Sequence, residues 1–295
     1  MKPFFIFFFF SIQLIAQKAL VEKVKQLRPD TPWELVRSTP LSFPTFHPQG
    51  MVKIGDVFYM SSVEVTRKRQ DNDGGEGKGH LFKFDANGKL LAQITLGEGA
   101  IYHPGGIDFD GKFIWVPVAE YRPKSQAIIY KVNPQSLKVE EVMRFGDHIG
   151  GIVHDTQAHA LTGISWGSRT FYTWPLDAKQ KPIIKLAPSQ KGLPNPSFYV
   201  DYQDCHYVGQ HQMLCGGLRK YRTSSESPVY AMGGLELVNL IDKRPVFQIP
   251  LPLWSPTGAP MTNNPFWVET ASNGIRAYFV PDDDSASTLF VYETR

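Results

Sequence analysis

A repeat spaced at 56 residues constrains the fold of this chain more than any other feature of its sequence. The segment His47-Pro48-Gln49-Gly50 returns as His103-Pro104-Gly105-Gly106. The same offset relates three further features of the two copies: a glycine turn at Gly55 and Gly111, an apolar strand over 57–60 and 113–116, and a glutamate at Glu64 and Glu120. Self-similarity at such a period is typical of solenoids and propellers.

Three weaker copies follow, and they begin at His148, Asp201 and Asn264. Each unit of roughly 50 residues has room for a meander of four strands, and a ring of such sheets is a β-propeller. The count favours an all-β fold with five blades. Six blades would result if the long segment 219–260 held a further pair of strands.

The two ends of the chain predict how the ring closes. After Asn264 only three strands fit, and the third runs over 288–292. The stretch 33–43 is strand-like and has no unit of its own. We therefore expect an N-terminal strand to complete the last blade, which would leave fewer exposed sheet edges.

The first residues resemble a signal peptide, with Lys2 before an apolar run that ends near Ala16. The expected division is a signal peptide over 1–16, a leader or short helix over 17–30 and the propeller domain over 31–295. The alternative is an uncleaved anchor, although the apolar run is shorter than the roughly 20 residues that span a bilayer. The predicted location is the periplasm or the exterior of the cell.

The chain has two cysteines, Cys205 and Cys215. Residues 201–218 read as a hairpin that turns at 209–211, so that Val208 would face Gln212 and Cys205 would face Cys215. Directly opposed cysteines are close enough for a disulfide, which export would permit. Free thiols are one alternative. A zinc site with His206 and His211 is another, but strand alternation places these ligands apart.

Composition supports an all-β protein and restricts its partners. Aromatic residues make up 13% of the chain, with 25 Gly and 23 Pro, as many short strands and turns require. The 31 basic and 28 acidic residues nearly cancel, for a net charge of +3. This balance favours neither nucleic acid nor a membrane surface as a partner after signal cleavage, and we expect a monomer.

Residues that begin the innermost strands should surround one mouth of the channel. This inner ring consists of His47, His103, His148, Asp201 and Asn264. Three imidazoles and a carboxylate are suitable ligands for zinc or another divalent metal, so His47, His103, His148 and Asp201 form one candidate metal site. The alternative is architectural: each His-Pro closes a turn between blades, and its imidazole bonds a backbone carbonyl.

Residues that end the second strands should form an outer ring on the same face. Its members are Glu64, Glu120, Arg169, Arg219 and the run Asp282 to Asp284. Glu64 and Glu120 are candidate catalytic acids or bases, while Arg169 and Arg219 are candidate ligand-binding groups. The alternative is a set of solvated loop ends paired to one another. The acidic run suits either calcium or an exposed turn.

A polar insertion, 66–79, interrupts the first unit and would form either a lid over the mouth or a loose loop.

The His-Pro-x-Gly opening, the glycine turn and the aromatic strand resemble the blades of propellers related to gluconolactonase and strictosidine synthase. Over its whole length the chain is more similar to an uncharacterised family of secreted bacterial propellers. The enzymes hold a catalytic metal with acidic and amide side chains at the channel mouth. Here three of the corresponding positions are histidine, so the resemblance does not carry that metal site over.

Two functions are consistent with this pattern. The first is a metal-assisted hydrolase or lactonase that acts on a small polar substrate at the channel mouth. The second is a scaffold that binds a small polar or carbohydrate-like ligand, or a partner protein, without chemistry. The fold alone does not decide between them.

Overall fold

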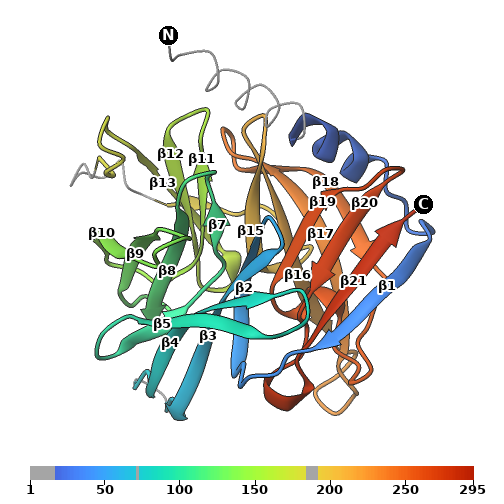
Figure 1. Cartoon of the computed structure of the whole chain (residues 1–295), viewed down its shortest axis with the longest axis horizontal. Coiled ribbons are helices and arrows are strands. Elements are labelled where there is room, and N and C mark those ends of the chain that lie inside the picture. Colours follow the sequence, from blue (N-terminus) through green and yellow to red (C-terminus); the bar gives the residue numbers. More distant parts are fainter. Residues whose placement is uncertain (1–16, 71–72, 184–191) are drawn as a thin grey trace.

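The repeated strands pair into five antiparallel sheets arranged in a ring, which confirms the five-bladed propeller (Figure 1). The structure is a computed structural model that describes residues 17–70, 73–183 and 192–295. The predicted signal peptide, 1–16, lies outside the described residues. None of the described helices is long and apolar enough to cross a membrane.

Blades one and two contain the two strong copies of the repeat. Blade one consists of β2 (His47–Ile54), β3 (Val57–Arg67), β4 (Glu76–Asp85) and β5 (Leu90–Leu96). Blade two consists of β6 (Ile101–Pro104), β7 (Asp108–Phe109), β8 (Ile114–Glu120), β9 (Ala127–Val132) and β10 (Val139–Phe145). Its inner edge is divided into β6 and β7, which both pair with β8.

The weaker copies form the other three blades. Blade three consists of β11 (Ile149–Asp155), β12 (Ala160–Ser165), β13 (Thr170–Pro175) and β14 (Leu193–Pro194). Blade four consists of β15 (Asp201–Gly209), β16 (Gln212–Tyr221), β17 (Tyr230–Asn239) and β18 (Arg244–Leu251). Segment 219–260 therefore completes blade four and supplies no sixth blade.

The last blade joins the two ends of the chain. It consists of β19 (Phe266–Thr270), β20 (Ile275–Phe279), β21 (Thr288–Thr294) and the N-terminal β1 (Trp33–Pro40). β1 pairs antiparallel with β21, from Trp33 opposite Thr294 to Pro40 opposite Thr288. In Figure 1 the blue β1 lies beside the red β21. The predicted closure of the ring by an N-terminal strand is confirmed.

The leader forms a helix over residues 17–25 that packs on the propeller. Its apolar side chains, Leu20, Val21, Val24 and Leu27, are all buried. They pack in one cluster with residues of blades four and five, such as Val208 and Val268. The Lys23 ammonium also donates a hydrogen bond to the Ala271 carbonyl (2.5 Å). The helical spacing in the sequence is thus explained by burial against one end of the ring.

The two ends of the insertion 66–79 extend the β3–β4 hairpin, because β3 continues to Arg67 and β4 begins at Glu76. One expectation of strand register was wrong. In blade four the partner of Gln212 is Gly209 and not Val208, since a bulge lies between Tyr207 and Gly209.

Candidate functional site

The repeated glycines bring neighbouring inner strands into direct contact. The Gly106 amide donates to the Gly150 carbonyl (2.9 Å), and the Ile152 amide donates to the Gly106 carbonyl (3.2 Å). A Cβ atom on Gly105 would lie 2.2 Å from the Gly150 oxygen, and one on Gly50 would lie 2.5 Å from the Ile107 amide nitrogen. No side chain fits at such distances, so the glycines of the motif keep the channel narrow here.

This close approach gathers the three histidines of the inner ring around one cavity. The rings of His103 and His148 are 6.0 Å apart between centroids. The cavity has a volume of about 160 Å³. We call it the histidine cavity, and its principal side chains are His47, Gln49, His103, Tyr121, His148, Ser165, Trp166, Tyr202, Gln203 and Asp204.

Aromatic side chains form one wall of the histidine cavity. His103 stacks on Tyr121 with 4.3 Å between ring centroids, and His148 meets Trp166 edge to face at 4.8 Å. The guanidinium of Arg69, from the extended hairpin of blade one, lies 5.3 Å from the ring centroids of both Tyr121 and Trp166. The insertion of blade one thus reaches this wall.

The two buried histidines of the cavity are held in the neutral state. Burial lowers the pKa of His148 to about 4, although its bond to a carbonyl works in the opposite direction. Its Nδ1 donates to the Glu120 backbone oxygen (2.9 Å), so the neutral ring leaves Nε2 as an acceptor beside Gly150. Burial, with the nearby His148 and His47, lowers the pKa of His103 well below its usual value. Its Nδ1 has no hydrogen-bond partner in the described part of the chain.

His47 occupies a different environment at the rim. Its side chain is 37% exposed, and Nδ1 lies 2.9 Å from the Asp283 carboxylate. The same carboxylate accepts a hydrogen bond from Asn264 Nδ2 (3.0 Å). The predicted inner ring and the acidic run therefore meet across the joint between blades five and one.

Asp201 is held by arginines and does not line the histidine cavity as the structure describes it. Arg169 lies 3.1 Å from its carboxylate, and Arg219 lies 3.0 Å from it. Arg169 also packs over the exposed ring of Phe198. The two candidate ligand-binding arginines thus share one carboxylate, which neutralises part of their charge.

Glu64 and Glu120, at matching positions of the repeat, also bond side chains close to them in their own blades. Glu64 lies 3.1 Å from His80 Nε2 and 3.7 Å from Lys78. Glu120 accepts a hydrogen bond from Arg122 (2.7 Å). Neither carboxylate is among the described residues that line the histidine cavity. Glu120 acts on the cavity through its backbone oxygen, which orients His148.

The four candidate metal ligands are not arranged as a metal centre. Across residues 17–70, 73–183 and 192–295, no group of three or more His, Cys, Asp or Glu side chains is placed to hold a metal ion. His47 and His148 have Nδ1 engaged elsewhere, and Asp201 is bound by two arginines. These residues do not fit a shared ion, so we derive no step through a metal.

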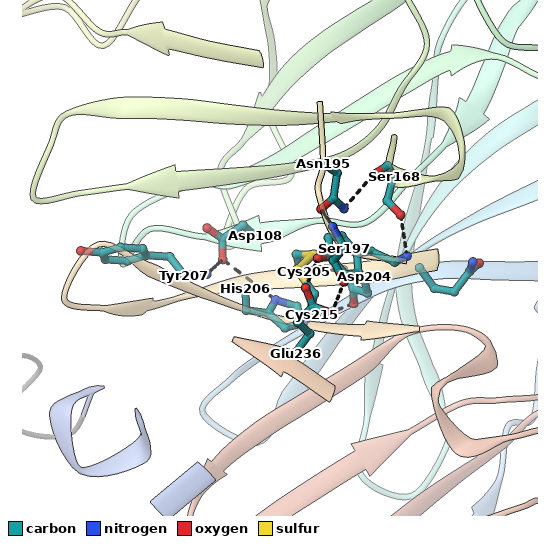
Figure 2. Close-up of a disulfide and its surroundings, with 12 residues drawn as sticks. Asp108, Ser168, Asn195, Ser197, Asp204, Cys205, His206, Tyr207, Cys215 and Glu236 are labelled. Atoms are coloured by element: carbon teal, nitrogen blue, oxygen red, sulfur yellow. Dashed lines mark hydrogen bonds and ion pairs between the residues drawn. A yellow bond between two sulfur atoms is a disulfide. The ribbon is translucent and has the colours of Figure 1, made fainter. Parts of the chain in front are cut away.

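Asp108, Asp204 and His206 form a buried polar layer near the disulfide (Figure 2), and Asp204 of this layer lines the histidine cavity. The Asp204 carboxylate accepts hydrogen bonds from the Met51 amide (2.8 Å) and the Ile107 amide (3.1 Å), and so links the inner strands of three blades. It also lies 3.3 Å from Nε2 of His206. Burial raises the pKa of Asp204, even though the charge of His206 opposes this shift.

Cys205, next to Asp204, forms a disulfide with Cys215 in the adjacent strand (Figure 2). The two residues are direct partners in the β15–β16 register, as the hairpin pattern predicts. No free cysteine remains.

Several lining residues were not predicted. Tyr121 directly follows Glu120, and Trp166 directly follows the end of β12. Gln49 and Gln203 lie at matching positions of their units, each two residues after an inner-ring residue and at a bulge of its strand. The repeat offset could have found both pairs. Asp204 carries no such signal, because a bulge between Tyr202 and Asp204 changes the facing of the strand.

Comparison with solved structures finds similar chains at low sequence identity. The tail fibre of Staphylococcus aureus phage P68 is 9% identical with a TM-score of 0.51, and the match covers 94% of this chain and 56% of that one. A DUF4623 family protein from Bacteroides eggerthii is 13% identical (TM-score 0.48; coverage 91% and 77%). The periplasmic gluconolactonase of Pseudomonas aeruginosa is 12% identical (TM-score 0.39; coverage 84% and 84%).

At 9% identity the likeness to the tail fibre concerns the fold alone. The search of curated proteins found no match. One family model matches residues 9–295, which is nearly the whole chain. The chain therefore belongs to a family of unknown function, DUF6454.

Proposed function

We propose that the histidine cavity binds a small, uncharged polar ligand of carbohydrate type. The observation that carries this proposal is the pairing of two neutral imidazoles with the aromatic faces of Tyr121 and Trp166 around one cavity. A volume of about 160 Å³ is roughly ten times the ~10–15 Å³ that a cavity needs, on the same measure, to hold one water. It suits a molecule on the scale of a monosaccharide.

The polar groups of the cavity match hydroxyls better than they match ions. The amides of Gln49 and Gln203 both donate and accept, and the neutral ring of His148 offers an acceptor at Nε2. The carboxylate of Asp204, which lines the cavity, disfavours anionic ligands. Tyr121 and Trp166 would supply apolar contact to a sugar from the part of their surface that lines the cavity, since His103 and Arg69 already pack on these rings.

Titration calorimetry with a panel of neutral monosaccharides and polyols tests this proposal. Trp166→Ala removes one aromatic face and should weaken binding by about tenfold, which corresponds to ~1.4 kcal/mol. Trp254→Ala is the matched control, because Trp254 is 45% exposed and does not line the cavity. If no neutral ligand binds at millimolar concentration, or if Trp166→Ala leaves the affinity unchanged, the proposal is wrong.

A second candidate is hydrolysis of a small lactone, and the orientation of His148 favours it. With Nδ1 fixed on the Glu120 oxygen, Nε2 could accept a proton from water as the hydroxide adds to the lactone carbonyl. The imidazolium would then return this proton to the ring oxygen as the C–O bond breaks, which gives the open-chain hydroxy acid and restores the neutral histidine. A pKa of about 4 makes His148 a weak base, so we rank this activity second. Adding sugar lactones to the same panel, with NMR detection of the free acid, separates binding from turnover.

A further inference from the structure

The exposed aromatic side chains of the described residues all belong to blade four and its flanking segments. They are Phe198, Tyr221, Tyr230 and Trp254. Single exposed apolar residues are ordinary on a protein surface, whereas a group of them marks an interaction site. The contacts of Phe198, Tyr221 and Tyr230 connect this group with the histidine cavity.

Phe198 is held at the surface by buried neighbours. Its side chain is 64% exposed, and the guanidinium of Arg169 lies 4.5 Å from the centroid of its ring. Arg169 in turn donates to the Ser197 carbonyl (3.0 Å). Three residues before Phe198, the buried Asn195 donates to the Ser168 carbonyl (2.9 Å), a bond drawn in Figure 2. The ring is therefore positioned in advance and still open to solvent.

The same arginine joins Phe198 to the rim of the histidine cavity. Gly167 lines this cavity and is exposed, so the cavity opens to solvent there. Arg169 Nε donates to the Gly167 carbonyl (2.6 Å). Its Nη2 lies 3.1 Å from the Asp201 carboxylate, which Arg219 also binds at 3.0 Å. A continuous path of contacts thus leads from the cavity to Phe198 and Arg219.

The β16–β17 hairpin extends this path. Arg219 and Tyr221 are two residues apart on β16 and share one face, and Tyr230 of β17 is the direct partner of Tyr221 on that face. Gly234 lies on the same face of β17. A Cβ atom there would be 2.6 Å from the hydroxyl oxygen of Tyr199, so the face is turned toward the segment that precedes β15. We call Phe198, Asp201, Arg219, Tyr221 and Tyr230 the rim surface.

We propose that the ligand of the histidine cavity is the end of an oligosaccharide, whose following sugar units lie on the rim surface. This inference rests on the function proposed above, because the terminal unit occupies the cavity. A volume of about 160 Å³ suits one sugar unit, so the remaining units must leave over the rim. Gly167 is an exposed part of that rim.

The polar groups of the rim surface match sugar hydroxyls. Arg219 donates to Asp201 through Nη1 only, so that Nε and Nη2 have no acceptor among the residues that the structure describes. The Asp201 carboxylate offers acceptors beside them, and it offsets part of the charge of the two arginines. The exposed ring of Phe198 would supply apolar contact to the C–H groups of a sugar. Alternating donors, acceptors and aromatic rings suit a neutral oligosaccharide chain.

Calorimetry with sugars of different length tests this inference on the purified protein. The probes are the monosaccharides of the panel above, among them glucose, mannose and N-acetylglucosamine, and for each its linear trisaccharide, such as cellotriose, mannotriose and chitotriose. The trisaccharide should bind about tenfold more tightly than its monosaccharide, through the added aromatic contact. Phe198→Ala should remove this gain and leave the affinity for the monosaccharide unchanged.

Three further variants locate the two parts of the ligand. Arg219→Gln removes the unpaired donors and should weaken trisaccharide binding severalfold without an effect on the monosaccharide. Trp166→Ala should weaken both, because both place a unit in the cavity. Ile241→Ala is the control, since Ile241 is exposed in the turn after β17, at the opposite end of blade four, and should change neither. Circular dichroism melting of all variants checks the fold.

The outcomes separate this inference from the function on which it rests. If a monosaccharide binds but its trisaccharide binds no more tightly, or if folded Phe198→Ala binds the trisaccharide as the wild type does, the rim surface has no role and the cavity proposal stands. Trisaccharide binding that Trp166→Ala leaves unchanged also overturns the inference, because the sugar would then lie outside the cavity. If no monosaccharide and no trisaccharide binds, both proposals fail.

Discussion

The two ends of the central channel are built from one set of inner strands and yet differ in chemistry. Where the strands begin, His47, His103 and His148 line a cavity with aromatic and amide side chains. Where they end, Ile54, Val208 and Val268 line an apolar cavity beneath the helix 17–25. The comparison teaches that polarity in these strands changes along their length, and not only between their two faces.

The buried histidines His148 and His206 also differ, because their pKa values are shifted in opposite directions. Burial lowers the pKa of His148, which faces no carboxylate within bonding distance among the described residues and bonds a neutral carbonyl. Burial also acts to lower the pKa of His206, but Asp204, Asp108 and the bond to the Phe266 carbonyl together raise it. Burial thus prevails over the partners of His148, whereas the partners of His206 together prevail over its burial.

Removal of the Asp204 carboxylate, which is buried between the two ends of the channel, should have the largest effect on stability. In Asp204→Ala, the buried amides of Met51 and Ile107 lose their acceptor, and His206 loses its carboxylate. We expect the free energy of unfolding to fall by about 3–5 kcal/mol, as for other broken buried ion pairs. Urea unfolding measures this change. Asp56→Ala, at an exposed turn, should change stability by less than about 0.5 kcal/mol, and an equal loss in both variants would contradict the assigned role.

A lower pH should reduce the stability of the protein through His148, which lies at the end of the channel where the inner strands begin. The pKa of His148 is about 4 in the folded protein and about 6.5 in an unfolded chain, so its contribution to stability is complete above pH 6.5 and is lost as the pH falls towards 4. Compared with His148→Gln, the wild type should lose on the order of 3 kcal/mol over this range.

Urea unfolding at several pH values measures this difference between wild type and variant. His159→Asn is the control, because His159 is exposed and has a positive φ that asparagine tolerates. A wild-type curve parallel to that of His148→Gln between pH 4 and 6.5 would show that His148 is not held neutral by the fold.

A smaller effect is expected at the apolar end. Val24 is fully buried in the cluster that joins the helix 17–25 to blades four and five. Val24→Ala should lower the free energy of unfolding by about 1–3 kcal/mol, through lost burial and a residual cavity. Val246→Ala, at a position 46% exposed, should have little effect in the same denaturation experiment. Equal stability of the two variants would mean that the helix does not contribute to the fold.

The sequence predicted the fold well because its repeat has a structural cause. The glycine after each His-Pro is required by backbone contact between inner strands, so the motif marks the start of a blade. The facing cysteines and the strand that closes the ring also followed from strand spacing. Strand spacing did not predict the partner of Gln212, because a bulge inserts one residue into β15 and leaves no signal in the alternation of the sequence.

The site was only partly predictable. The repeat places His47, His103 and His148 at one mouth, and the structure brings them to one cavity. The repeat says nothing of the partners that side chains find across blades, such as the two arginines on Asp201 or the Glu120 carbonyl on His148. Those contacts depend on three-dimensional neighbours, and they decide which groups remain free for a ligand.

The pairing of β1 with β21 has a consequence for the order in which the chain can fold. β1 is among the first strands to be synthesised, but its partner begins only at Thr288, about 250 residues after Pro40. At 5–20 residues per second, translation of this interval takes roughly 12–50 s. For that time β1 is a strand without a sheet, and the last blade is unfinished. The ring can therefore close only after β21 has been synthesised, and loss of β21 would leave both β1 and β20 without a partner strand.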